Sequence, residues 1–153
     1  MRRIKRRQGE PLAPPLVPAS TYFVSGDPAD APFAYGRTAN PTWSALEAEY
    51  EAVGGAPCLA FASGMAACAA VVDALVPRGT CIVAPCDGYY ALRSLLRSRG
   101  IDARLVGSTD PLAFAVAAPN AALVWVETPT NPGLDVVDVR ATAEACRRAG
   151  ALL

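Results

Sequence analysis

Three short segments place polar and small residues directly after apolar runs. Residues 127–132 read Glu-Thr-Pro-Thr-Asn-Pro and follow the apolar run 121–126. Pro129 and Pro132 lack the N–H group that a strand ladder needs, so the chain must leave the strand in a stiff polar loop. The amide of Asn131 offers a donor and an acceptor in that loop. Because open α/β sheets bind ligands at the carboxyl ends of their strands, this loop is a candidate site.

The second segment, residues 62–66, reads Ala-Ser-Gly-Met-Ala at the junction between an apolar run and a small-residue helix. Backbone N–H groups at a helix start attract phosphate, and Gly64 would let an anion come close. The backbone of Gly64 and Met65 is therefore a candidate phosphate site. The same small residues could instead only let a helix and a strand pack closely, and the G-x-G-x-x-G fingerprint of a dinucleotide site is missing.

The third segment, residues 86–90, reads Cys-Asp-Gly-Tyr-Tyr and follows another apolar run. An aromatic ring such as that of Tyr89, held at the edge of a sheet, could stack on a flat heterocycle. The tyrosine pair could instead cap the edge of the hydrophobic core. The residues alone leave both interpretations open.

The composition is that of a globular chain without metal chemistry. The 153 residues are 52% hydrophobic and 18% charged, which suits about one domain. Fourteen basic and fourteen acidic residues cancel, which argues against a general role on nucleic acid or anionic membranes. There is no histidine, and the five cysteines show no C-x-x-C spacing, so no metal site is expected and most thiols should be buried and reduced.

The first residues of the chain form a basic cluster, which comprises Arg2, Arg3, Lys5, Arg6 and Arg7. Such a run is typical of a solvated tail, and no interleaved aromatic residues support nucleic-acid contact. No apolar stretch follows that would make a secretory signal, and no run of 18 or more apolar residues predicts a spanning helix. We therefore expect a cytoplasmic protein with neither nucleic-acid nor membrane partners.

The apolar periodicity predicts alternating helices and strands after an irregular, proline-rich start with at most a short strand at 21–24. Asn40-Pro41 should open a helix that Gly54-Gly55 closes. Further helices are predicted over 64–76, 89–99 and 138–149, and strands over 58–62, 81–84, 103–106 and 122–126. Without a hairpin signal, this order indicates an α/β fold with a mostly parallel sheet wrapped by helices. Residues 151–153 read as the start of another buried strand.

A fourth segment decides how the other three are interpreted. Residues 35–42 read Tyr-Gly-Arg-Thr-Ala-Asn-Pro-Thr and are followed by Leu46-Glu47. This segment resembles the Y-x-R-x-x-N-P-T…L-E signature of the Cys/Met-metabolism family of pyridoxal-5′-phosphate (PLP) enzymes, which includes cystathionine γ-synthases, cystathionine γ-lyases and homoserine sulfhydrylases. The three segments above resemble, in the same order, the family's S-G-M-A-A, D-x-Y-G-G-T and E-T-P-T-N-P motifs. Four motifs in register over residues 35–132 make the resemblance specific.

The resemblance implies PLP fold type I, an aspartate-aminotransferase-like three-layer sandwich with a mostly parallel sheet. It assigns residues 1–41 to an N-terminal arm that packs on a neighbouring subunit. Residues 42–153 would be the first part of the PLP-binding large domain. The expected assembly is a homo-oligomer. Two subunits would share their sites in a dimer, and the complete assembly is expected to be a tetramer.

The resemblance also implies roles for the candidate residues. The backbone of Gly64 and Met65 would hold the PLP phosphate, and the ring of Tyr89 would stack on the pyridine. Asn131 would hydrogen-bond near the phenolic oxygen of the cofactor and to the substrate carboxylate. These assignments place one half of a cofactor site within the chain.

Two residues before the first helix would serve the neighbouring subunit. By the resemblance, Tyr35 and Arg37 reach the phosphate of the neighbour's cofactor, and Tyr35 also contacts the substrate. Arginine suits this role because its planar fork binds phosphate oxygens bidentately.

The sequence departs from the family pattern in one motif and lacks the residues that follow it. Tyr90, Ala91 and Leu92 stand where the family usually has Gly-Gly-Thr, so this loop is bulkier and the substrate specificity can differ. The family's Schiff-base lysine, the aspartate for the pyridine nitrogen and the arginine for the substrate carboxylate all lie downstream of the match. Since the only lysine is Lys5, we expect no catalytic residue in this chain, which would be the N-terminal part of a longer enzyme.

For that longer enzyme the resemblance implies cleavage of the C–S bond of cystathionine, a small amino-acid substrate. Cystathionine γ-synthase and O-acylhomoserine or O-acetylhomoserine sulfhydrylase activities remain alternatives because they share the motifs. An alternative of another class is a non-catalytic truncated module that binds only phosphate or a partner. A stop codon directly after Leu153 would favour the module, and a continuing reading frame would exclude it.

Overall fold

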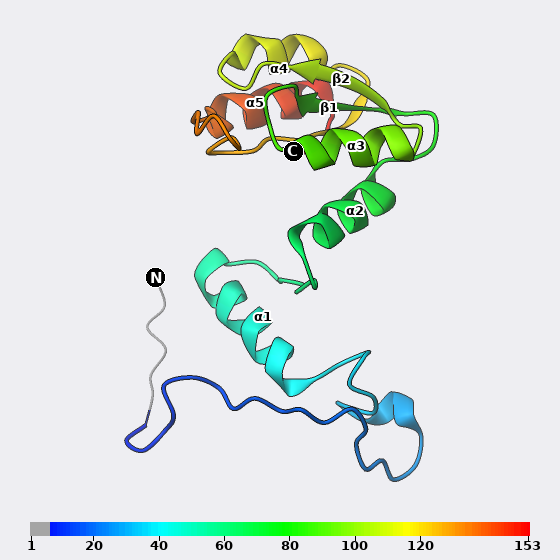
Figure 1. Cartoon of the computed structure of the whole chain (residues 1–153), viewed down its shortest axis with the longest axis vertical. Coiled ribbons are helices and arrows are strands. Elements are labelled where there is room, and N and C mark those ends of the chain that lie inside the picture. Colours follow the sequence, from blue (N-terminus) through cyan, green and yellow to red (C-terminus); the bar gives the residue numbers. More distant parts are fainter. Residues whose placement is uncertain (1–6) are drawn as a thin grey trace. The chain divides into compact units, whose positions relative to one another are not determined.

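The structure is a computed structural model that describes residues 7–153 as two units (Figure 1). The first unit ends at Phe61, and the second spans Ala62–Leu153. Each unit contains one of the two tryptophans, Trp43 and Trp125. The predicted basic tail lies outside the described residues, except for Arg7.

The first unit is mostly irregular and contains the 3₁₀ helix η1 (Pro28–Asp30) and the helix α1 (Pro41–Gly54). The limits of α1 are as predicted. Asn40 caps its start, since its Oδ1 accepts the N–H of Thr42 at 2.8 Å. Gly55 ends it in the left-handed region with φ 74°, which glycine adopts without steric cost. The predicted strand at 21–24 is reduced to one antiparallel bridge between Thr21 and Tyr35.

Hydrogen bonds rather than an apolar core organise the first unit. Asn40 is 7% exposed, and its Nδ2 donates to the carbonyl oxygens of Val17 (3.1 Å) and Ala19 (3.3 Å) and to Tyr22 Oη (3.1 Å). Among the described residues, the buried hydrophobic side chains all belong to the second unit. Three apolar side chains of α1 are half or more exposed: Leu46, Tyr50 and Val53.

The second unit is built on a parallel sheet of three strands in the order β2-β1-β3. The strands are β1 (Cys81–Pro85), β2 (Asp102–Val106) and β3 (Ala121–Val124). The helices are α2 (Gly64–Leu75), α3 (Tyr90–Ser98), α4 (Pro111–Ala117) and α5 (Val139–Ala149). The strands predicted over 81–84, 103–106 and 122–126 and each predicted helix are present within two residues of their expected limits.

Two apolar clusters on opposite faces of the sheet produce three layers. Successive residues of a strand point to opposite faces. Val83 of β1 belongs to a cluster with Phe114 of α4 and with α5, whereas Ile82 belongs to a cluster with Leu96 of α3 and with α2. Figure 1 shows α4 and α5 along one side of the sheet and α3 on the other. The predicted three-layer α/β architecture is thereby confirmed.

One prediction about local structure was wrong, and one helix was not predicted. Residues 58–62 are not a strand. A strand exists only through a ladder partner, and none of the described strands pairs with this segment. The helix α4 was not predicted, although Asp110 caps its start by accepting the N–H of Leu112 at 2.9 Å and Pro111 occupies its first turn.

The last residues do begin to extend the sheet beyond β3. Leu152 makes a parallel bridge with Leu123. The N–H of Val124 donates to Leu152 O at 2.8 Å, and the N–H of Leu152 donates to Ala122 O at 3.2 Å. The predicted strand at 151–153 is thus present as a single bridge, but it is not buried, since Leu152 is 51% and Leu153 is 46% exposed.

Candidate functional site

The carboxyl ends of β1 and β3 bring Tyr89 and Asn131 to one cavity. Its volume is about 470 Å³, and it is lined by Asp87, Gly88, Tyr89, Tyr90, Arg93, Asn131 and Pro132. Tyr89 follows β1, and Asn131 lies in the Glu-Thr-Pro-Thr-Asn-Pro loop that follows β3. Since these strands are parallel neighbours, their carboxyl ends share one edge of the sheet, as the sequence predicted.

The two tyrosine rings meet edge to face at this cavity. Their centroids are 5.0 Å apart and their planes are inclined by 61°. Tyr89 is 38% exposed and Tyr90 is 66% exposed. This exposure disfavours the alternative that the pair caps the hydrophobic core, and it favours a ring that is free to cover a ligand.

The start of α2 is open, as a phosphate site requires. Ser63 caps the helix, because its Oγ accepts the N–H of Ala66 at 3.1 Å. The N–H groups of Gly64 and Met65 precede the first intrahelical hydrogen bond. A Cβ added at Gly64 would meet no atom within 4 Å. An anion therefore has room to approach these two N–H groups.

Glu127 connects the site segments, and the sequence did not single it out. Its Oε2 accepts the backbone N–H of Tyr89 at 2.7 Å. It also lies near α2, where its charge acts on Cys68. The pKa of the Cys68 thiol is raised, mainly by burial, while a backbone hydrogen bond opposes the rise and the negative charge of Glu127 adds to it. Glu127 thus joins the Tyr89 turn to the loop after β3, whereas Gly64 and Met65 do not line the cavity.

Gly88 is required by the close packing of this turn. A Cβ at position 88 would lie 2.7 Å from Glu127 Oε2 and 2.7 Å from Pro85 Cγ. On the other side, Arg93 Nη1 donates to Gly88 O at 2.7 Å. A larger residue here would have to displace the Glu127 carboxylate and the Pro85 ring, so the turn before Tyr89 is closely packed.

Asp87 joins the ends of β1 and β2. Its carboxylate accepts the hydroxyl of Ser108 at 2.6 Å and the N–H of Ser108 at 3.0 Å. The hydrogen bond from the Ser108 side chain is the main reason why the pKa of Asp87 lies below its ordinary value of 3.8. Asp87 itself is exposed, so its contribution to stability is modest.

We expect Asp87 to contribute to the acid lability of the second unit. Because its pKa is lower in the folded state, its stabilising effect is complete above its unfolded pKa near 4 and is lost as the pH falls through the folded pKa. The free energy of urea unfolding of Asp87→Asn should therefore depend less on pH below about pH 4 than that of the wild type. Identical pH profiles for both proteins would show that the Ser108 hydrogen bonds contribute nothing.

Within the first unit, the side chains of Tyr35 and Arg37 contact each other. The Arg37 guanidinium lies over the Tyr35 ring, 4.9 Å from its centroid, and Tyr35 is 40% exposed. Between them, Gly36 donates its N–H to Ser20 O at 2.8 Å, and a Cβ there would lie 2.7 Å from Ala19 O. Their approach to a cofactor phosphate stays a prediction, since both belong to the first unit.

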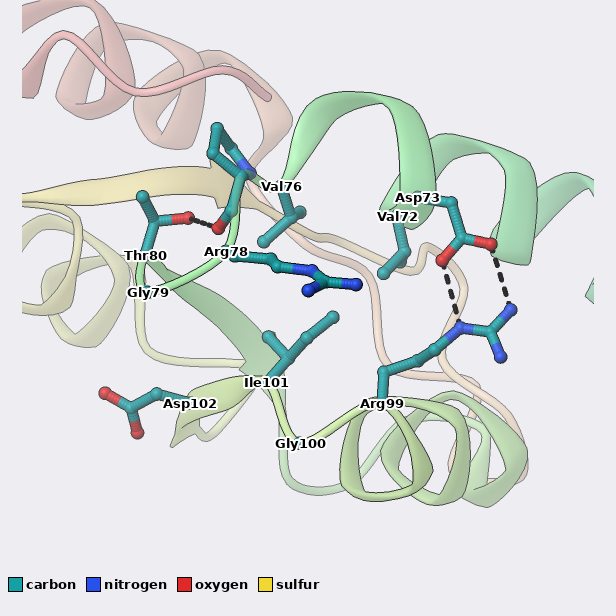
Figure 2. A pocket seen from close by; sticks show the side chains of 11 residues that line it. Val72, Asp73, Val76, Arg78, Gly79, Thr80, Arg99, Gly100, Ile101 and Asp102 are labelled. Atoms are coloured by element: carbon teal, nitrogen blue, oxygen red, sulfur yellow. Dashed lines mark hydrogen bonds and ion pairs between the residues drawn. The ribbon is translucent and has the colours of Figure 1, made fainter.

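A larger cavity of about 730 Å³ lies at the amino ends of β1 and β2 (Figure 2). At its rim Arg99 forms an ion pair with Asp73 at 2.9 Å, and the Arg78 side chain extends over Val76 and Ile101. None of the predicted site residues lines this cavity. Ligands of open α/β sheets bind at the carboxyl ends of the strands, so the smaller cavity is the candidate site despite its size.

Two other kinds of site have no candidate in residues 7–153. No group of three or more His, Cys, Asp or Glu side chains there could hold a metal ion. Of the helices that the structure describes, none combines the length and apolar character needed to cross a bilayer.

The family comparison agrees with the geometry of the site. The family described as "Cys/Met metabolism PLP-dependent enzyme" matches residues 2–153. The chain belongs to this family. Membership implies PLP as the cofactor, and it confirms the resemblance of the four motifs.

Curated relatives of this PLP-dependent family are longer than the chain. A Streptomyces coelicolor protein that carries the name cystathionine gamma-lyase is 44% identical over 152 residues, which cover 94% of this chain and 38% of the relative. The cystathionine gamma-lyase of Macaca fascicularis is 36% identical over 146 residues, which cover 91% of this chain and 36% of the relative. The chain thus spans less than two fifths of the length of these relatives, which confirms that it covers only a part of the family's length.

Solved structures of the PLP-dependent family share the fold. Cystathionine gamma synthase from Xanthomonas oryzae pv. oryzae, solved in complex with cystathionine, aligns with a TM-score of 0.82 and 32% identity, covering 92% of this chain and 38% of that chain. A gamma lyase (CalE6) from Micromonospora echinospora aligns with a TM-score of 0.77 and 37% identity. The alignment covers 90% of this chain and 38% of that chain. The predicted PLP fold type I is confirmed for the part that the chain covers.

The described residues fit the non-covalent half of a PLP site. The open start of α2 suits a phosphate, the exposed Tyr89 ring suits a pyridine, and Asn131 shares the cavity with that ring. A covalent anchor is not among them, because the only lysine of the sequence is Lys5. The described residues thus suit the phosphate and the pyridine ring of the cofactor, and no lysine is among them.

Proposed function

We propose that the whole protein is a PLP-dependent enzyme that cleaves the C–S bond of cystathionine, as a cystathionine gamma-lyase does. The observation that carries this proposal is the shared cavity of Tyr89 and Asn131, which places two family motifs at one sheet edge. The 44% identity to a protein named cystathionine gamma-lyase supports this choice of reaction.

The residues of this chain bind and orient the cofactor in this proposal. The N–H groups of Gly64 and Met65 hold the phosphate, and Tyr89 covers one face of the pyridine ring. Asn131 donates to the phenolic oxygen of the cofactor and to the carboxylate of the substrate. When bound, PLP would supply an electron sink for the negative charge that develops on the substrate carbons before the C–S bond breaks. The lysine that moves protons lies beyond Leu153 by the family resemblance.

We further propose that the protein is a cytoplasmic homo-oligomer with shared sites, either a dimer or a tetramer that consists of two such dimers. Residues 1–41 form an arm that packs on the neighbouring subunit, and residues 42–153 begin the large domain. The lack of buried apolar side chains in the described part of the first unit supports this, because such a segment gains order by packing on another surface. Tyr35 and Arg37 then serve the neighbour's cofactor phosphate and substrate.

Cystathionine gamma-synthase is the second candidate activity. It is favoured by the TM-score of 0.82 to the Xanthomonas oryzae synthase. Where the family usually has Gly-Gly-Thr, this chain begins α3 with Tyr90, Ala91 and Leu92, so the expected bulkier loop is a helix start. Leu92 is buried, whereas Tyr90 lines the cavity. The Tyr90 side chain is therefore where the two activities would be distinguished.

The complete open reading frame should be expressed and purified with PLP to test these activities. We expect cystathionine and water to yield cysteine, ammonia and 2-oxobutanoate. Formation of cystathionine from cysteine and an O-acylated homoserine, measured on the same preparation, should be slower. Faster formation than cleavage would favour the synthase. A frame that stops after Leu153, or a complete protein that binds no PLP, would favour the non-catalytic module.

A further inference from the structure

The peptide group between Gly88 and Tyr89 is bound at both of its polar ends by charged side chains. Arg93 Nη1 donates to the carbonyl oxygen of Gly88 at 2.7 Å. The N–H of Tyr89 donates to Glu127 Oε2, also at 2.7 Å. These two atoms belong to one planar unit. A single rigid plane is thus held between a cation and an anion, an arrangement that we call the peptide clamp.

The two charged side chains come from different parts of the second unit. Arg93 lies in the first turns of α3, and Glu127 follows β3, 38 residues after Tyr89. Tyr89 is the N-cap residue of α3 and makes no side-chain capping bond. Glu127 instead accepts the N–H of the N-cap residue itself, one of the N–H groups at a helix start that have no intrahelical partner, and a negative charge is favourable there. Hydrogen bonds to ionised groups are stronger than neutral ones.

The backbone before Tyr89 contributes to the orientation of its ring. Within the part of the chain that the structure describes, the ring of Tyr89 contacts one other aromatic ring, that of the exposed Tyr90. No described side chain makes a hydrogen bond with its hydroxyl. The direction of its Cα–Cβ bond follows from the peptide plane that precedes it. Gly88 limits movement of that plane further, since it packs against Glu127 and Pro85.

We propose that Glu127 and Arg93 are positioning residues, which orient the ring of Tyr89 through the peptide clamp. The proposal rests on the proposed function, because Tyr89 is taken as the residue that stacks on PLP. Neither side chain needs to touch the cofactor in this role. A residue that only stabilised the fold would affect PLP binding whether or not the tyrosine ring is present.

The test uses the complete protein and titrates PLP into the cofactor-free form. Glu127→Ala should raise the PLP dissociation constant by about tenfold, the scale of one lost hydrogen bond to a charged group. Glu127→Gln should stay within about threefold of the wild type, because its amide oxygen can still accept the Tyr89 N–H. Glu144→Ala is the matched control, since it removes a surface carboxylate that pairs with Arg148 at 2.6 Å, and it should leave PLP binding unchanged.

A double-mutant cycle distinguishes positioning from general stabilisation. In a Tyr89→Ala background, Glu127→Ala should change the PLP dissociation constant by no more than about twofold, because the ring that it orients is absent. Equal effects of Glu127→Ala in both backgrounds would overturn the proposal. Arg93→Met, with Arg93→Lys as its conservative partner, repeats the cycle from the other end of the clamp if Glu127→Ala does not fold.

Amide hydrogen exchange examines the clamp without the cofactor. The Tyr89 amide of cofactor-free Glu127→Ala should exchange at least about tenfold faster than in the wild type, and that of Glu144→Ala should not. Unchanged exchange in Glu127→Ala would overturn the clamp itself. If the complete wild-type protein binds no PLP, the proposed function fails, whereas additive effects on measurable PLP binding overturn only the positioning role.

Discussion

Arg37→Ala in the complete protein should leave the homo-oligomer nearly inactive, yet mixing it with a second inactive variant should restore activity. The second variant lacks the catalytic lysine expected beyond Leu153. In a mixed dimer, one site combines the Arg37 of the lysine variant with the lysine of the Arg37→Ala chain. Random mixing makes about half of the dimers mixed, each with one intact site of two, so activity should reach about a quarter of the wild-type value.

This prediction depends on subunit exchange, which must be measured alongside activity. Differently tagged variants can be co-purified after mixing to show that mixed dimers have formed. If they have formed and activity stays at the level of the separate variants, Arg37 acts within its own chain. The Arg37 guanidinium, which lies over the ring of Tyr35, would then serve its own site or none.

Tyr89→Ala in the complete protein should weaken PLP binding by about 1–3 kcal/mol, the usual cost of truncating a stacking aromatic residue. Tyr89→Phe should retain most of the affinity, because the face of the ring survives and the hydroxyl contributes no hydrogen bond to a described residue. The PLP dissociation constants of the two variants measure the difference.

Tyr90→Ala is the matched control for that pair, since its ring also borders the cavity and is more exposed than that of Tyr89. We expect a smaller loss of PLP affinity for Tyr90→Ala. If Tyr89→Ala and Tyr89→Phe behave alike and Tyr90→Ala is the damaging change, Tyr90 is the stacking residue. The departure from Gly-Gly-Thr at positions 90–92 makes this comparison informative.

The sequence was sufficient to predict elements whose signals are local. Asn40 and Pro41 predict the start of α1, and Gly55 predicts its end, because capping and left-handed backbone depend on single residues. The apolar run at 81–84 predicts β1 because both of its faces are buried. Tyr89 and Asn131 share a cavity because parallel strands end at one edge, which follows from the alternation of helices and strands.

Features that depend on distant partners were not predictable in this way. Residues 58–62 have the composition of a strand, but pairing decides whether a ladder forms, and no described strand pairs with them. Glu127 was seen only as part of a motif, because its bond to Tyr89 joins residues 38 positions apart. The helix α4 was missed for another reason. Its Asp110-Pro111 start was present in the sequence, but seven largely apolar residues show no amphipathic period.

The two units carry separate fluorescent reporters, which affects how the unfolding of this protein is measured. Trp43 lies in α1 of the first unit, and Trp125 follows β3 and packs beside the cluster that contains Ile82. The first unit relies on the hydrogen bonds of Asn40, and the second on a buried core, so the two need not unfold together. A single emission curve would merge two transitions into one apparent midpoint. Variants with one tryptophan each would assign every transition to its own unit.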